Sequence, residues 1–189
     1  MGTLILRSIV LLLLPPVVFL GGGYLMLKLS EHEQVTQQQR DKIEAAKDRK
    51  GLGLRITGYD LAAVKTFWGA LDPKALAAER RMLELDLLFP FFYGSAFAAV
   101  LLCAWVGLGR PFSPVWIMAP VIINVSADWT ENLTQLSQLR LFPALQPGWI
   151  QIASLATIVK ITFFSVSYLF GVGLVVWMVF RNWPRSSAG

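Results

Sequence analysis

The stretch VIINVSADWTENLTQL, residues 121–136, decides how this chain folds, because it begins as an apolar run and then turns polar. The apolar run starts near Pro114 and lasts only to Val125, whereas roughly 20 residues are needed to cross the hydrocarbon of a bilayer. A helix that crosses here must therefore carry Asp128, Glu131 and Asn132 with it. Charges at that depth cost about 2.5–3.5 kcal/mol each, so they are expected to face one another or a cavity.

The composition indicates an integral membrane protein. Of the 189 residues, 55% are hydrophobic and the mean hydropathy is +0.55, whereas soluble domains are about 45–50% apolar. The net charge is +5, but basic and acidic residues alternate, which argues against nucleic acid and favours anionic lipid headgroups as partners. Cys103 and His32 are the only cysteine and histidine. Disulfide frameworks, haem held by histidine and the usual zinc sites are thereby excluded, and we expect no cofactor and no metal.

Four apolar segments predict an all-α, antiparallel bundle of four transmembrane helices that forms one membrane domain, residues 1–189. The predicted spans are 4–28, 83–108, 114–137 and 150–180, with a polar helical connection over 29–82. Within that connection, EHEQVTQQQRDKIEAAKDRKG (31–51) is polar on every face and is expected to prolong the first helix into water as far as Gly51.

The rest of the connection predicts two more helical segments. Asp60 has the character of an N-cap, and Leu61, Val64 and Trp68 recur on one face, as in a helix that lies at a membrane interface. Asp72-Pro73 then starts a helix that continues without a stop signal into the second span.

Counting spans predicts that distant polar residues meet. In an antiparallel bundle of four spans, the start of span two, the second half of span three and the start of span four share one depth, which places Asp86 and Lys160 beside the polar part of span three. Helical spacing also gathers side chains onto single faces: Asn124, Asp128, Glu131, Asn132 and Gln135 in span three, and Asp86, Pro90, Tyr93 and Phe97 in span two.

Pro90 adds an oxygen to this polar layer. It has no N–H to donate to the carbonyl of Asp86, so that carbonyl is expected to be free and the helix kinked. Three carboxylates and one lysine then share one depth. Either a Lys160–Asp128 pair merely joins two helices, or the layer is a functional site in which Asp86, Asp128 and Glu131 are candidate acids and bases.

Two segments carry a resemblance to a known family. AAVKTFWGALDPKAL (62–76) and LELDLLFPFF (83–92) resemble EXPERA-type four-span membrane proteins, which include emopamil-binding sterol isomerases and sigma-two-receptor-like proteins. The segment between Asp72 and Glu84 is shorter than in that family, and its proline-tryptophan entry to the second span is missing. The chain is also similar to bacterial four-span membrane proteins with DLLFP and ADxxEN signatures, a likeness that implies no function.

The EXPERA resemblance implies a lateral pocket for a hydrophobic, often cationic ligand. Its acidic groups would bind the ligand's charge and, as in the isomerases, move a proton across a sterol double bond. Asp72, Glu84 and Asp86 would take the acidic positions, to which this chain adds Asp128 and Glu131. The remaining candidates for ligand contact are Tyr93, Asn124, Asn132 and Lys160.

Three functions therefore stay open. The first is a membrane pocket that binds, or isomerises, a lipid or sterol-like molecule. The second is a non-catalytic accessory or assembly subunit of a larger membrane complex, since the face of Leu61, Val64 and Trp68 suits a partner. The third is a proton or cation carrier, which would require a homodimer. A count of basic residues alone would place the long connection and the 140–148 loop on the cytoplasmic side, but acidic residues balance the charge of that connection. The side that holds Arg7, Arg110, Arg181 and Arg185 has no acidic residue, so both termini are expected to be cytoplasmic.

Overall fold

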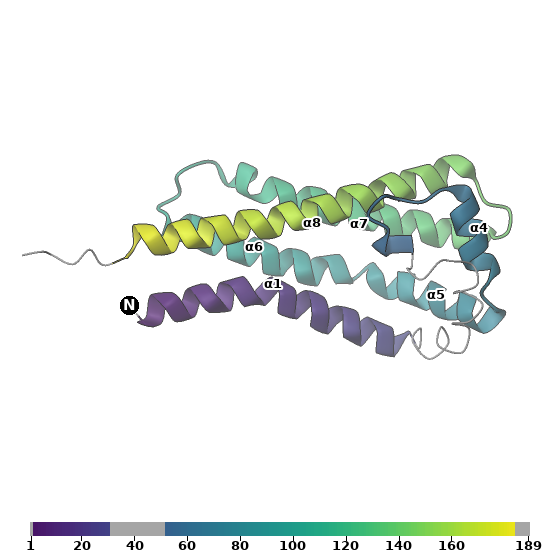
Figure 1. The fold of residues 1–189 in the computed structure, drawn as a ribbon, viewed down its shortest axis with the longest axis horizontal. Helices are drawn as coiled ribbons and strands as arrows, with labels where there is room; N and C mark the ends of the chain where they lie inside the picture. Colours follow the sequence, from purple (N-terminus) through teal and green to yellow (C-terminus); the bar gives the residue numbers. More distant parts are fainter. Residues whose placement is uncertain (1, 31–51, 184–189) are drawn as a thin grey trace, which may run out of the picture.

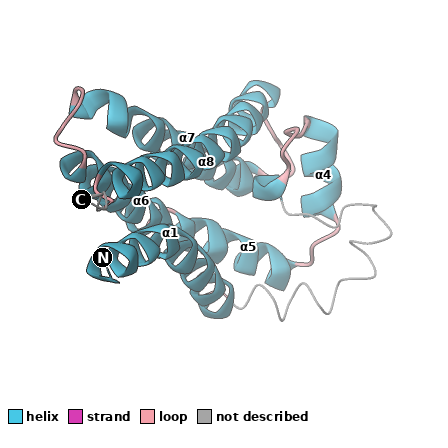
Figure 2. Ribbon diagram, turned by 60° about the vertical axis from the view of Figure 1, so that its left-hand side comes forward, coloured by secondary structure: helices cyan, strands magenta, loops and turns pink. Residues whose placement is uncertain are grey.

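The computed structural model describes residues 2–30 and 52–183, and these residues form helices and no strand (Figures 1 and 2). The predicted all-α class is therefore confirmed for this part of the chain. The polar segment 31–51, with the predicted helix end at Gly51, lies outside the described residues. The elements are α1 (Gly2–Leu29), the short 3-10 helix η1 (Leu52–Leu54), α4 (Leu61–Gly69), α5 (Pro73–Asp86), α6 (Phe89–Gly107), α7 (Pro114–Leu141) and α8 (Pro147–Arg181).

Within residues 2–30 and 52–183, three stretches are long and apolar enough to cross a membrane: Ile5–Leu29, Pro73–Gly107 and Pro147–Arg181. Large apolar side chains are exposed along α1, α7 and α8, among them Leu20, Trp116 and Phe180. Such a surface suits contact with lipid. These features indicate a multi-pass membrane protein. Helix α7 is also 28 residues long, but its second half is polar.

The helix starts predicted at Asp60 and Asp72 are both confirmed. Each carboxylate accepts a hydrogen bond from the main-chain N–H three residues later, at Ala63 and Ala75, over 2.8 Å. These caps satisfy donors that the first turn of a helix leaves unpaired, and Pro73 needs no such partner because it has no N–H.

Helix α4 does not present its apolar face to the outside. Val64 and Trp68 are completely buried, and the Trp68 ring meets Phe142 edge-on, with their centroids 6.1 Å apart. The same core includes Ile150 and Ala153 of α8. The face predicted for a membrane interface or a partner is thus covered by the chain itself, because α4 folds back against α8.

The helix predicted to continue from Pro73 into the second span is broken at residues 87–88, between α5 and α6. Pro90 cannot donate to the Asp86 carbonyl, and the N–H of Phe91 bonds to the Leu88 carbonyl instead of continuing the α-helical pattern. Helix α7 supplies the missing donors. The Asn132 amide donates to the Asp86 carbonyl over 3.2 Å, and the Trp129 indole donates to the Leu87 carbonyl over 2.9 Å.

Two apolar cores flank the polar face of α7. One is built from α6, α7 and α8, with α1 packed against it, and the other from η1, α4, α5, α8 and the loop that holds Tyr59. Tyr93 belongs to the first core and Tyr59 to the second, and each hydrogen-bonds to a polar side chain of α7. In Figure 1, α4 and α5 lie at one end of the molecule, whereas the start of α1 and the end of α8 lie at the other.

Candidate buried acidic site

Lys160 of α8 joins the two acidic side chains of α7. Its Nζ lies 2.5 Å from Glu131 Oε2 and 3.3 Å from Asp128 Oδ1. The side chains of Glu131 and Asp128 are 0% and 5% exposed, and that of Lys160 is 16% exposed. The pairing places one ammonium between two carboxylates in an environment with little water, where each charge needs a partner.

Neutral side chains also donate hydrogen bonds to both carboxylates. Asp128 Oδ2 accepts from the Tyr93 hydroxyl over 2.7 Å, and Oδ1 accepts from the Asn132 amide over 3.1 Å. Glu131 Oε1 accepts from the Thr157 hydroxyl over 2.6 Å and from the Gln135 amide over 2.9 Å. Hydrogen bonds to a charged carboxylate are stronger than neutral ones, so these four donors help to hold the negative charge in place.

Asp86 is the third carboxyl group of this acidic cluster, which we define as Asp86, Asp128, Glu131 and Lys160. Its main-chain carbonyl is tied to Asn132, and its half-buried carboxyl group lies within electrostatic range of Asp128, Lys160 and Glu131. The cluster therefore holds three carboxyl groups and one ammonium. Within residues 2–30 and 52–183, no three His, Cys, Asp or Glu side chains converge closely enough to hold a metal ion.

The main chain of η1 lies against the acidic cluster. A Cβ atom added to Gly53 would sit 3.2 Å from Glu131 Oε1 and 3.6 Å from Lys160 Nζ. The first of these separations is tighter than most side-chain contacts allow, so the absence of a side chain lets the backbone approach the ion pair.

Tyr59, in the loop before α4, connects α8 to the polar face of α7. Its main-chain N–H donates to Ser154 Oγ over 2.8 Å, and its hydroxyl accepts from the Gln135 amide over the same distance. Burial, together with the negative charge of Glu131, raises the pKa of Tyr59 to about 12. The phenol is therefore neutral at physiological pH.

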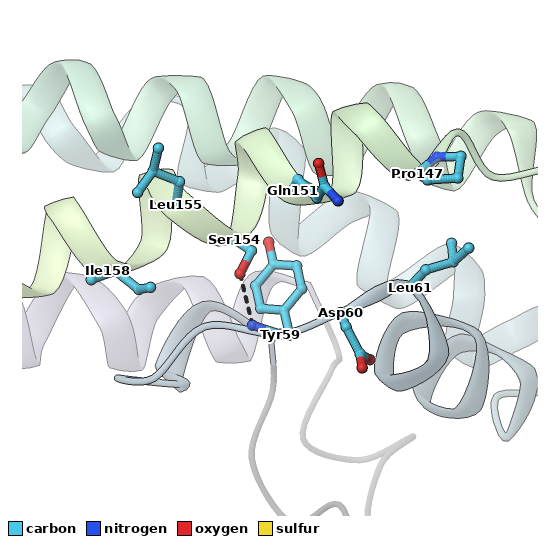
Figure 3. Close-up of a pocket in the computed structure, with 8 residues that line it drawn as sticks. All are labelled: Tyr59, Asp60, Leu61, Pro147, Gln151, Ser154, Leu155 and Ile158. Carbon is cyan, nitrogen blue, oxygen red and sulfur yellow. Dashed lines mark hydrogen bonds between the residues drawn. The ribbon is translucent and has the colours of Figure 1, made fainter.

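A groove of about 350 Å³ runs along α8 on the outer side of Tyr59 (Figure 3). Leu155 and Ile158 lie on one side of Tyr59 in this view, and Leu61 and Pro147 on the other. Asp60, Gln151 and Ser154 add polar groups to the otherwise apolar lining. The volume falls within the usual range for small-molecule sites.

The structure brings together most of the residues singled out from the sequence, but three of them lie elsewhere. Asp72 is exposed and caps α5. Glu84 is exposed and pairs with Arg80 over 2.9 Å. Asn124 is buried on the same face of α7 but makes no hydrogen bond to the acidic cluster.

Sequence reasoning missed three contributors to the site: Gly53, Tyr59 and Thr157. Thr157 precedes Lys160 by three residues, so helical spacing could have placed it on the same face. Gly53 and Tyr59 lie outside long helices and show no periodic signal. Only the folded chain places them beside the carboxylates.

Comparison of the chain with protein-family models, with curated proteins and with solved structures gives no significant match. The proposed function therefore depends on the geometry and chemistry of the acidic cluster and the groove.

Proposed function

We propose that this chain is a four-span membrane protein whose acidic cluster binds a hydrophobic, lipid-like or sterol-like ligand by that ligand's polar or cationic end. The observation that carries the proposal is the excess of carboxyl groups in the cluster. Asp128 and Glu131 contact the single ammonium of Lys160, and Asp86 lies within electrostatic range of all three. A contact that only joins two helices needs one carboxylate and one ammonium. The additional negative charge favours a proton or a cationic group as a partner.

Helix α7 is the proposed fourth span. It packs between α6 and α8 and runs antiparallel to α8, since Asp128 and Glu131 pair with Lys160 whereas Gln138, further along α7, bonds to Gln146 before α8 begins. The start of α1 and the end of α8 lie at the same end of the molecule (Figure 1). An even number of crossings satisfies this arrangement. The arginine-rich end, without acids, is then the cytoplasmic one.

The groove along α8 is the proposed path for the apolar part of the ligand. Leu61, Leu155 and Ile158 offer apolar contact, and the Tyr59 ring lines the same groove. The Tyr59 hydroxyl and Glu131 share the Gln135 amide as a common donor. In this proposal, a ligand in the groove approaches Glu131 when the Tyr59 side chain moves aside.

The positions of the acidic residues change which of them would take the roles that the EXPERA resemblance implies. Asp72 and Glu84 are at the surface, so the proposal assigns the charge-binding role to Asp86, Asp128 and Glu131. In an isomerisation, a protonated carboxyl group of this set would donate a proton to one carbon of a double bond, and a carboxylate would remove a proton from a neighbouring carbon. Both protons are accounted for, and no redox cofactor is needed.

Ligand capture tests the binding proposal. The protein is purified in mild detergent and exposed to a photoreactive sterol and a photoreactive long-chain amine, and labelling is compared between wild type, Asp128→Asn and Glu131→Gln. Each cluster variant is expected to bind the probe more weakly than wild type. A loss of about 1.4 kcal/mol in binding free energy lowers labelling by about tenfold at low probe concentration. Glu84→Gln is the matched control, because Glu84 is an exposed carboxylate paired with Arg80.

Undiminished labelling in both cluster variants, with Glu84→Gln also unchanged, would overturn the binding proposal. Turnover is read separately by incubating the protein with an unsaturated sterol in deuterium oxide. A shifted double bond with one deuteron incorporated supports isomerisation, whereas binding without incorporation limits the function to a receptor or carrier of the ligand.

The other two functions receive less support from the contacts. The apolar face that suggested an accessory subunit is buried against α8. The ring of Tyr93 contacts Phe19, Phe89, Phe97 and Phe164, and this apolar packing disfavours a proton path through the whole bundle. The hydrogen-bonded network has Tyr59, beside the groove, at one end and Tyr93, in the aromatic core, at the other. This arrangement favours a site that a ligand reaches from the Tyr59 side.

A further inference from the structure

One buried polar side chain of α7 and one of α8 have no hydrogen-bond partner among the described residues. Asn124 of α7 is 0% exposed and leaves both Oδ1 and Nδ2 unpaired, and Ser167 of α8 is 0% exposed and leaves its Oγ unpaired. A buried polar group without a partner is destabilising, because it loses the hydrogen bonds that it makes to water in the unfolded chain. The three unpaired atoms therefore point to a bound group that can both donate and accept hydrogen bonds.

Ser167 differs from four other hydroxyl side chains of α7 and α8. The hydroxyls of Thr130, Thr134, Thr157 and Ser165 each donate to the main-chain carbonyl four residues earlier, over 2.6–3.0 Å. This local bond is the usual way in which a helix satisfies a serine or threonine. Ser167 does not make it, so its hydroxyl is available to another partner.

The antiparallel pairing of α7 and α8 places Asn124 and Ser167 at one level. Glu131 and Lys160 are in direct contact; Asn124 precedes Glu131 by seven residues, and Ser167 follows Lys160 by seven. Seven residues are about two helical turns, which moves both positions roughly 10.5 Å in the same direction and returns each to nearly the same helix face. Asn124 and Ser167 therefore face the same interface, two turns beyond the ion pair.

We propose that Asn124 and Ser167 bind an internal water molecule. The Asn124 carbonyl oxygen can accept from the water, its amide can donate to the water, and Ser167 Oγ can do either. Buried waters typically make about three hydrogen bonds to groups that are otherwise unsatisfied, and these two side chains supply that number. The water extends the polar network of α7 beyond Asp128. Further along the bundle the packing is apolar, with Ile117, Val121, Leu174 and Val175 buried.

The direct test is water-edited solid-state NMR on the full chain in lipid bilayers. Transfer of magnetisation from water to the Asn124 side-chain amide is expected in wild type and is expected to fall when Ser167→Ala removes one partner of the water. Ser165→Ala is the matched control, because that hydroxyl is exposed and bonds to the Ile161 carbonyl. Absence of water contact at Asn124 in the wild-type protein overturns the proposal without relying on any variant.

A double-mutant cycle gives a second measurement. With a bridging water, Ser167→Ala lowers the unfolding temperature in the wild-type background by a few degrees and has less effect in the Asn124→Leu background, because the bridge is already lost. Without a bridge, Asn124→Leu removes unsatisfied atoms and raises the unfolding temperature, and the two substitutions are additive. That result would count against the water site.

Discussion

The side-chain amide of Asn132 donates to the main-chain carbonyl of Asp86, 3.2 Å away, and this is the carbonyl that Pro90 leaves without a helical donor. The same amide also donates to Asp128 over 3.1 Å. One residue of α7 thus stabilises the break between α5 and α6 and helps to hold a carboxylate of the acidic cluster. The break and the cluster are therefore coupled.

Replacing Asn132 tests this coupling. Asn132→Leu is expected to lower the free energy of unfolding in micelles by about 1–3 kcal/mol, because a buried carbonyl and a carboxylate each lose a donor. In a Pro90→Ala background, residue 90 regains an N–H that can bond to the Asp86 carbonyl. The cost of Asn132→Leu should then be smaller by about 1 kcal/mol. Equal costs in the two backgrounds would mean that the amide does not stabilise the break.

Removing the ammonium of Lys160 should be among the most destabilising single changes in the bundle. Lys160→Met leaves Glu131 and Asp128 buried without their cation, and breaking a buried pair in this way costs about 3–5 kcal/mol. Lys160→Arg keeps the charge and should cost less. Lys65→Met on the exposed side of α4 is the control and should change stability by less than about 0.5 kcal/mol. Denaturant titration of the three variants distinguishes these outcomes.

The close approach of η1 to the ion pair makes Gly53 sensitive to substitution. Gly53→Val introduces a branched side chain where even a Cβ would lie 3.2 Å from Glu131 Oε1, so η1 must move away from the acidic cluster. Steric crowding of this kind usually costs about 1–3 kcal/mol. Gly69→Val is the control, because a Cβ at Gly69 meets nothing within 4 Å. Thermal unfolding in detergent compares them, and similar shifts for both would argue against close packing of η1.

Tyr59 should make stability depend on pH in the alkaline range. Its pKa is about 12 in the folded chain against 10.0 for the free side chain, because burial and Glu131 disfavour the phenolate. Since the folded pKa is the higher one, the stabilisation is complete below about pH 10 and is lost as the pH rises through about 12. The difference corresponds to roughly 2–3 kcal/mol.

Denaturation at pH 9 and pH 12 measures this contribution. The wild type should lose more stability over that interval than Tyr59→Phe, which has no phenolic proton, and tyrosinate absorbance should place one tyrosine near pH 12. If the two proteins lose stability equally, the Tyr59 hydroxyl is not buried as described.

Local sequence features predicted much of this architecture. N-cap chemistry placed the starts of α4 and α5 at Asp60 and Asp72, and the missing N–H of Pro90 predicted a disturbed helix at Asp86. Helical periodicity gathered Asn124, Asp128, Glu131 and Asn132 onto one face, and all four are buried. These features depend on interactions within a few residues of one another, so they can be read from the chain alone.

The tertiary structure decided which partner each polar group has. Periodicity could not indicate that Glu131 bonds to Thr157, that Tyr93 bonds to Asp128, or that Trp129 satisfies the carbonyl left free beside the helix break. It also could not show that Asp72 and Glu84 stay at the surface while Gly53 and Tyr59 reach the carboxylates. Local hydrogen bonding fixes the direction in which a helical side chain points, but only the packing of helices distant in sequence determines what it meets.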